Sequence, residues 1–152
     1  MKKNNNKGFT LAELLIVVAI IAVLVAIAIP IFNSQLEKAR EATDVANIRD
    51  AYAEIAVAMI DGGLTKDGDT IKVVGTHTAT LSGSGKIVTV AGMKVEQKVL
   101  DNWAIGNPTV AGVTINTLPT AATTNVVFTF AETTNATTGA KQTYLSTITF
   151  TA

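Results

Sequence analysis

The sequence predicts an α+β protein. One long N-terminal α-helix, apolar in its first half and amphipathic in its second half, is expected to pack on a small antiparallel β-sheet head. Three observations lead to this fold class. An apolar run extends from Leu14 to Phe32, a segment without glycine or proline follows from Asn33 to Met59, and alternating Val, Phe, Ile and Thr residues come after Gly63. At 152 residues, the chain has room for one domain besides a membrane segment.

The apolar run has the composition and length of a membrane helix. Its residues carry no charged or hydrogen-bonding side chain, and as a helix it would span roughly 28 Å, close to the thickness of a bilayer core. A secretory signal peptide also begins with a basic and then an apolar segment, but no small-residue cleavage site followed by polar sequence ends this run. A simple membrane anchor, with the preceding lysines on the cytoplasmic side, is the alternative interpretation.

Two residues of this helix are unusual for a simple anchor. Glu13 stands at its beginning, and a charged side chain at the centre of a bilayer costs about 2.5–3.5 kcal/mol, so this carboxylate is expected to need a cationic partner. Pro30 lies near its far end and cannot donate the backbone hydrogen bond to the carbonyl of Ala26. The sequence therefore predicts a kink or local unwinding at Pro30.

The second half of the helix shows one apolar stripe. Apolar residues recur there at intervals of three and four positions, namely Val45, Ile48, Tyr52, Ile55 and Met59. Because β-rich sequence follows directly, we expect this stripe to pack against a sheet rather than to form a coiled-coil seam. The charged residues between Glu37 and Glu54 are expected to lie on a solvated face, and Asp61-Gly62-Gly63 is expected to end the helix.

The head is predicted to consist of a variable loop at about 62–109 and an antiparallel sheet at about 110–150. Its three best strands, which would form a meander over the helix stripe, are Val110–Thr117, Asn125–Phe130 and Thr143–Phe150. Two shorter runs, Ile71–Val74 and Lys86–Val90, are expected to be joined by a loop over Gly75–Gly85. Met93–Trp103 is compatible with a short helix or with a strand followed by a turn.

Composition and motifs give little indication of catalysis. Twelve basic residues balance twelve acidic ones, which gives no sign of a nucleic-acid partner, and the chain has no cysteine. Asp61, Asp67 and Asp69 cluster without the spacing of a calcium-binding EF-hand loop, and turns favour aspartate in any case. The single histidine, His77, is expected to be exposed in a loop.

Two short matches are also weak. Gly83-Ser84-Gly85-Lys86 lacks the full spacing of a phosphate-binding loop, and Asn135-Ala136-Thr137 matches a glycosylation sequon of a kind that is common by chance. No credible set of nucleophile, base and acid exists. We therefore expect a protein that is not an enzyme and that holds no cofactor and no metal.

The segment Gly8-Phe9-Thr10-Leu11-Ala12-Glu13, with a lysine-rich leader before it and the apolar helix after it, closely resembles the type IV pilin family. This family includes the pilins of type IV pili, the pseudopilins of type II secretion and competence pilins. The resemblance covers about the first 55 residues. It implies that a prepilin peptidase removes residues 1–8 by cutting between Gly8 and Phe9 and then methylates the new amino group of Phe9. Residues 9–33 would then form the membrane and filament-core helix, and residues 34–152 the head.

The resemblance also implies roles for Glu13 and Pro30. Glu13 of one subunit would meet the α-amino group of Phe9 in its neighbour and so set the axial register of a growing filament, and Pro30 would be the helix proline of the family. The residues alone are also compatible with a pair inside one subunit, in which Glu13 contacts the α-amino group of its own Phe9, because the two residues are four positions apart in the same helix. The chain departs from many members of the family in two ways. It has Asp50 about where a second proline would fall, and it lacks the paired cysteines of the C-terminal loop.

What the resemblance implies is a structural subunit of a type IV pilus-like surface filament. The precursor would be a single-pass protein of a bacterial cytoplasmic membrane, and its partners would be copies of itself, membrane lipid, the prepilin peptidase, and an assembly platform with its ATPase. A pseudopilin or minor pilin of a type II secretion or competence system is an alternative. An uncleaved, membrane-anchored extracellular binding module is an alternative of another class.

Overall fold

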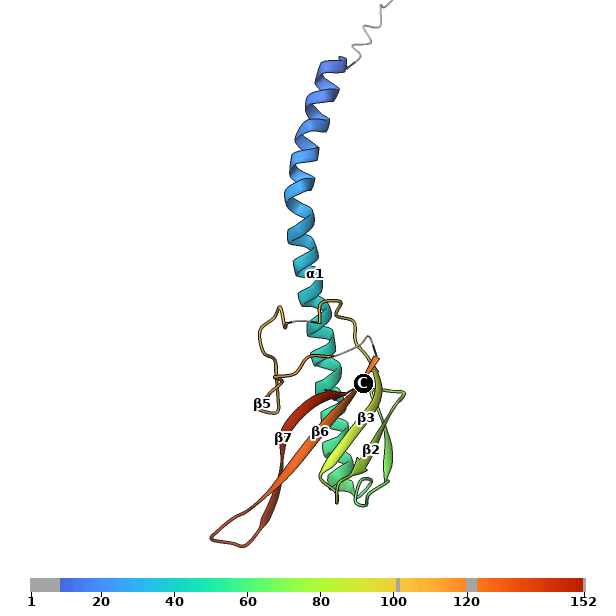
Figure 1. The fold of residues 1–152 in the computed structure, drawn as a ribbon, viewed down its shortest axis with the longest axis vertical. Coiled ribbons are helices and arrows are strands. Elements are labelled where there is room, and N and C mark those ends of the chain that lie inside the picture. Colours follow the sequence, from blue (N-terminus) through green and yellow to red (C-terminus); the bar gives the residue numbers. More distant parts are fainter. Residues whose placement is uncertain (1–8, 101, 120–122, 152) are drawn as a thin grey trace, which may run out of the picture. The chain divides into compact units, whose positions relative to one another are not determined.

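A computed structural model of the protein describes residues 9–100, 102–119 and 123–151 (Figure 1). Helix α1 extends from Leu11 to Asp61, and antiparallel β-strands follow it, so the predicted α+β fold class is confirmed. The chain divides into two compact units, Met1–Leu36 and Glu37–Ala152.

In the first unit, every described side chain from Phe9 to Leu36 is exposed. The apolar stretch is long and apolar enough to cross a membrane, and its most apolar window is 0% buried. The helix continues through Pro30 without interruption. The kink expected at Pro30 stays a prediction.

In the second unit, one antiparallel sheet of five strands has the order β1-β2-β3-β6-β7 (Figure 1). Its strands are β1 (Thr70–Val73), β2 (His77–Ser82), β3 (Ile87–Lys94), β6 (Thr123–Thr134) and β7 (Lys141–Thr151). Strands β4 (Thr109–Val110) and β5 (Val113–Thr114) form a separate two-stranded hairpin. A register shift between Val90 and Met93 interrupts the pairing of β3 with β6, and Gly92 adopts a φ of +66° there.

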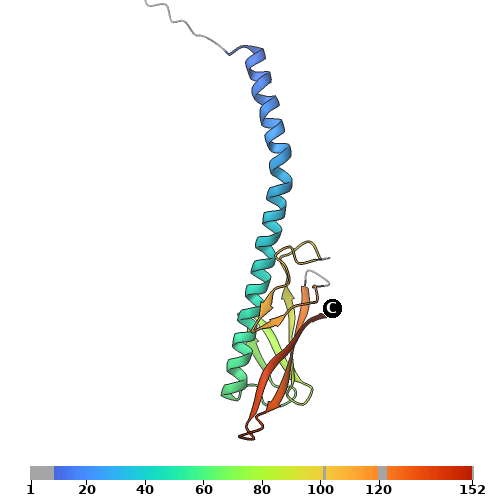
Figure 2. The same ribbon diagram turned by 90° about the vertical axis from the view of Figure 1, so that its left-hand side faces the viewer.

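The core lies between the sheet and the second half of α1, which covers one face of the sheet (Figure 2). The predicted stripe is confirmed, because Val45, Ile48 and Ile55 are buried and Tyr52 and Met59 pack against the same cluster. The strands contribute alternate residues from one face, including Leu81, Val88, Val90, Val126 and Phe128. Burying each such side chain contributes about 1.5–3 kcal/mol.

The helix ends where the sequence predicts. Gly62 takes a φ of +81°, a conformation that a side chain would disfavour, and the amides of Gly63 and Leu64 turn back to donate to the carbonyl of Ala58. The Asp61-Gly62-Gly63 sequence therefore ends α1 by satisfying one of its last free carbonyls.

The strand predictions were correct in part. Asn125–Phe130 and Thr143–Phe150 lie within β6 and β7, and Ile71–Val74 and Lys86–Val90 overlap β1 and β3. The expected loop Gly75–Gly85 was wrong, because β2 occupies most of it. Its sequence, HTATLS, already alternates in the way a half-buried strand does, and Ala79 and Leu81 point into the core.

The prediction of a single strand over Val110–Thr117 was also wrong. Ala111 and Gly112 both have positive φ and form a tight turn, which splits the segment into β4 and β5, outside the main sheet. The main sheet therefore begins at Thr70 rather than near residue 110, and a five-stranded sheet replaces the expected three-stranded meander. The described residues of Met93–Trp103 form no helix; β3 ends at Lys94, and the described residues that follow are irregular.

Candidate functional sites on helix α1

The first site is the N-terminal turn of α1, where Thr10 and Glu13 bind each other. The backbone N–H and the hydroxyl of Thr10 donate to Glu13 Oε2 at 2.8 and 2.7 Å, and the amide of Glu13 donates back to Thr10 Oγ1 at 3.3 Å. This reciprocal pair is a capping box, which satisfies two of the amides that a helix N-terminus leaves free. This capping box was not predicted, although its signal, Thr-x-x-Glu before an apolar run, is present in the sequence.

The structure describes only some of the residues around this turn. Phe9 is 88% exposed, while Gly8 lies outside the described residues, as does the rest of the expected leader. Because Phe9 follows Gly8 in this chain, its nitrogen is a peptide nitrogen and not the α-amino group that the resemblance pairs with Glu13. In the uncut chain, the Glu13 carboxylate thus takes its partner from its own turn of helix.

The second site is a row of three buried carboxylates, Glu37, Glu41 and Asp44, on the second half of α1. Each accepts hydrogen bonds from two successive backbone amides of the loop after β3. Asp44 accepts from Glu96 and Gln97 at 2.8 and 3.0 Å, Glu37 from Lys98 and from Val99 (2.7 Å to the latter), and Glu41 from Ala104 and Ile105 at 2.9 Å each. Hydrogen bonds to charged acceptors are stronger than neutral ones. The row therefore holds a loop whose described residues have no regular secondary structure of their own.

The placement of these carboxylates corrects the expectation of a solvated face. Glu41 is 0% exposed, and Glu37 and Asp44 are also buried. Their positions, 37, 41 and 44, continue the three- and four-residue spacing of the apolar stripe toward the N-terminus, so they lie on the same side of the helix as Val45 and Ile48. This continued spacing was a signal that could have identified them.

Burial and hydrogen bonding shift the pKa in opposite directions at two of these carboxyl groups, Glu37 and Asp44. Burial is the largest influence on both and favours the neutral acid. For Glu37, the amides of Val99 and Lys98 and the guanidinium of Arg40, 3.1 Å away, together outweigh burial and lower the pKa. For Asp44, burial prevails over its two amide donors, and the nearby charges of Glu96 and Glu37 add to it, so the pKa is raised.

Two further side chains of α1 form hydrogen bonds with the backbone of other segments of the head. The guanidinium of Arg49 donates to the carbonyl of Thr109 through Nε and Nη2, at 3.3 and 3.0 Å. Glu54 Oε2 accepts the amide of Val74 at 2.8 Å. Val74 has a φ of 48°, which is unusual for a β-branched residue, and this bond supports the strained turn between β1 and β2.

Two of the three aspartates considered for metal binding have backbone partners instead. Asp69 accepts the amides of Thr65 and Lys66, and Asp67 accepts the amides of Ser84 and Gly85. The Gly83–Lys86 segment is thus the turn between β2 and β3 rather than a loop before a helix. Among the described residues, no group of three or more potential ligands could hold a metal ion.

Two other residues singled out from the sequence also have structural places. His77 begins β2 and is partly buried, which corrects the expectation of an exposed loop histidine. Asn135 lies in the exposed turn between β6 and β7, where its side-chain oxygen accepts the amides of Thr137 and Thr138.

Comparison with known proteins gives a match to one family model and to several curated proteins. Residues 3–29 match the family model described as the prokaryotic N-terminal methylation motif. The chain is 42% identical over 67 residues to a type IV major fimbrial protein FimA of Dichelobacter nodosus (strain VCS1703A), covering 44% of this chain and 41% of that protein. It is 35% identical over 79 residues to fimbrial protein Q of Moraxella bovis, covering 49% of this chain and 50% of that protein.

These matches leave much of each relative uncovered. The chain spans about half or less of the length of these two relatives, and 62% of another fimbrial protein of Dichelobacter nodosus, to which it is 34% identical over 99 residues. No solved structure gives a significant match.

Proposed function

We propose that the protein is a structural subunit of a type IV pilus-like surface filament, because the N-terminal methylation motif and the fimbrial relatives support the type IV pilin family. In this proposal the chain is cut after Gly8, methylated on Phe9 and polymerised through its apolar helix. The relatives are named as fimbrial proteins, and the match to the N-terminal methylation motif covers residues 3–29, which include much of this helix.

The observation that carries the proposal is the exposure of the apolar helix. Every side chain from Phe9 to Leu36 is exposed, and most of the large ones, among them Ile16, Leu24 and Phe32, are exposed by more than half. A helix that is apolar all round needs an apolar environment on every side. Membrane lipid supplies this environment to the precursor, and the same helices of neighbouring subunits supply it in the filament core.

Helix association in such a core gains little from escape from water, because lipid is already apolar. Shape and the few polar groups therefore decide how the helices fit together. Cleavage would create a cation, the α-amino group of Phe9, close to the Thr10–Glu13 capping box. In our proposal, Glu13 then takes the amino terminus of a neighbouring subunit as its partner, and this contact sets the register of the filament.

The remaining parts of the chain have corresponding roles. Residues 1–8 serve as the leader, residues 9–33 as the membrane and filament-core helix, with a compliant point at Pro30, and residues 34–152 as the outward-facing head. The partners are copies of the chain itself, the prepilin peptidase, and an assembly platform with its ATPase. The precursor lies in the cytoplasmic membrane and the product at the cell surface. We assign it no enzymatic role.

Two variants test the proposal in cells. Gly8→Ala should block processing and leave a membrane-bound precursor, whereas an uncleaved anchored module would be unaffected. Glu13→Ala should still be processed but should fail to enter filaments. Normal filaments made of Glu13→Ala subunits would overturn the register role of Glu13. An unchanged N-terminus in the wild-type protein would overturn the proposed function as a whole.

A further inference from the structure

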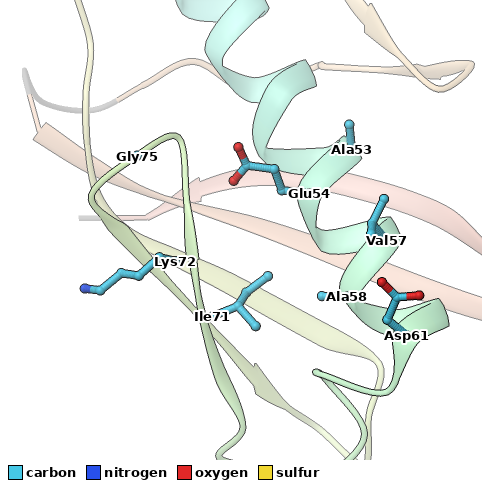
Figure 3. A pocket seen from close by; sticks show the side chains of 8 residues that line it. All are labelled: Ala53, Glu54, Val57, Ala58, Asp61, Ile71, Lys72 and Gly75. Atoms are coloured by element: carbon cyan, nitrogen blue, oxygen red, sulfur yellow. The ribbon is translucent and has the colours of Figure 1, made fainter.

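The end of α1 forms one wall of an open groove in the head. The groove has a volume of about 620 Å³ and lies between the last turns of the helix and strand β1 (Figure 3). Its floor is apolar, since Ile71 points from β1 toward the helix where Ala58 lies, and Val57 is 57% exposed beside them. We call this feature, lined by Ala53, Glu54, Val57, Ala58, Asp61 and Ile71, the helix-end groove.

The charged groups around this groove are not equally available. Glu54 already accepts the amide of Val74, and Lys72, which also lines the groove, donates its ammonium group to Thr76 and Thr78. Asp61 makes no side-chain hydrogen bond or ion pair with any residue that the structure describes. The groove therefore presents an apolar floor together with one available carboxylate.

A second exposed surface has the complementary character. The loop after β3 presents Val99, Leu100 and Ile105, which are 44%, 36% and 40% exposed, together with the exposed Lys98. Within the described part of the chain, the Lys98 ammonium group has no ion-pair partner. We call these four residues the loop surface.

The row of buried carboxylates gives this loop surface a fixed shape. Glu37 holds the amides of Lys98 and Val99, and Glu41 holds the amide of Ile105. A surface that is already ordered loses less conformational entropy when it binds. The backbone is thus fixed from behind while the apolar side chains and the lysine remain exposed.

Within one subunit these two surfaces cannot meet. The loop surface is held at Glu37 and Glu41, and the groove begins at Ala53, about 24 Å beyond Glu37 and about 18 Å beyond Glu41 along the same helix. We infer that the loop surface of one copy of this chain binds in the helix-end groove of another copy, with Lys98 beside Asp61. This inference rests on the proposed function, because it describes how heads would contact each other in the filament.

The contact would be of the heterologous kind, because it joins two different surfaces. Contacts of this kind produce open helical filaments when the rotation between copies does not close a ring. Four side chains on the loop make only a small interface, which would be weak between free heads. Copies whose apolar helices are already held together meet at high effective concentration, so a weak contact is sufficient there.

Cysteine cross-linking tests the inference against a clean background, because the chain has no cysteine of its own. The double variant Leu100→Cys/Val57→Cys is expressed in the full chain, and surface filaments are exposed to a mild oxidant. We expect a ladder of disulfide-linked dimers and larger oligomers, because the two positions would approach within the roughly 7 Å between Cα atoms that a disulfide tolerates. The matched control Leu100→Cys/Asp50→Cys, which places the second cysteine at another exposed position of α1, should remain monomeric.

The outcomes separate the inference from the proposed function. Filaments that form but yield only monomers after oxidation would overturn the inference and leave the filament subunit in place. If the wild-type chain forms no filaments at all, the proposed function itself fails. A ladder in both double variants would also count against the inference, because it would reflect non-specific collision.

A charge exchange gives a second measurement that does not depend on cysteines. Lys98→Glu and Asp61→Lys should each reduce the amount of sheared filament several-fold at an unchanged level of processed protein. The combined variant Lys98→Glu/Asp61→Lys should restore it. Single variants without effect, or a combined variant no better than either of them, would overturn the pairing of these two surfaces.

Discussion

The two halves of helix α1 use the same backbone in opposite ways. From Leu11 to Leu36 the side chains are exposed, and those beyond Glu13 are apolar as far as Phe32. From Glu37 to Asp61 one side of the helix is buried against the sheet, and that side includes three carboxylates. The usual distribution of residues, apolar inside and charged outside, is thus reversed along much of this helix.

The difference shows that burial depends on the partner and not on the residue alone. The isoleucines of the first half are exposed because the described part of the chain provides nothing to cover them. Glu37, Glu41 and Asp44 are buried because six backbone amides of one loop need acceptors. The first half is therefore suited to a surface outside its own head, and the second half organises the head.

The same substitution in both halves should have the most unequal effects. Ile55→Ala removes a side chain that is 0% exposed and should lower the free energy of unfolding of the head by about 2–5 kcal/mol, since it leaves a cavity. Ile20→Ala, at a position 55% exposed, should leave that free energy unchanged. Urea unfolding of the detergent-solubilised chain, followed by Trp103 fluorescence, measures both. Equal losses would contradict the division of the helix into two uses.

Removing one carboxylate from the buried row should have the next largest effect. Glu41→Ala deprives the amides of Ala104 and Ile105 of their acceptor and should cost about 2 kcal/mol. Hydrogen exchange should accelerate at these two amides, while Asp50→Ala, at an exposed position of the same helix, serves as the control. Unchanged protection of both amides in Glu41→Ala would show that the carboxylate does not hold the loop.

The capping box of the first half should have a smaller and local effect. Thr10→Ala removes the side-chain cap and should destabilise the first turn of α1 by about 1 kcal/mol, without a change in the stability of the head. Thr10→Ser keeps a hydroxyl and should behave like the wild type. Amide exchange at Glu13 in detergent distinguishes the two variants, and equal exchange rates would refute the cap.

The smallest effect concerns how the stability of the head depends on pH through the buried row. Glu37 and Asp44 should change this stability in opposite directions as the pH rises. The lowered pKa of Glu37 means that the unfolded chain binds more protons below the ordinary value of 4.5, so the stability from Glu37 is lost as pH falls through that window. The raised pKa of Asp44 means that the folded chain binds more protons above the ordinary value of 3.8, so stability falls there as pH rises.

Glu37→Gln should therefore flatten the acid side of the stability profile, and Asp44→Asn should remove the fall that begins above 3.8. Urea unfolding at several pH values from about 3 to 6 measures both changes. Changes of the same sign in the two variants would contradict the balance of burial and hydrogen bonding that we describe.

The parts of the fold that follow from local pattern could be predicted from the sequence. The helix stripe, the glycine stop after Asp61 and the alternating strands β6 and β7 depend on periodicity and turn residues within a few positions of one another. Strand β2 was missed because its threonine-rich sequence lies between two glycine turns, which made the segment read as a loop. The division of Val110–Thr117 was missed because a positive φ at Ala111 is not visible in a β-like run.

The candidate sites show the same limit more clearly. The Thr10–Glu13 cap is local and was available in the sequence, whereas the partners of Glu37, Glu41 and Asp44 lie more than fifty positions away along the chain. Spacing could place these carboxylates on the buried side of the helix, but no local rule indicates which amides they would meet. A glutamate at such a position is therefore assigned to solvent unless its distant partner is known.

Mass spectrometry of material sheared from the surface of cells that express this chain tests the central claim most directly. Our account predicts a sheared fraction dominated by this protein, with methylated Phe9 as its first residue. The same N-terminus found only in membranes would indicate a pseudopilin or minor pilin. A chain that still begins at Met1 or Lys2 and remains in the membrane would contradict the account.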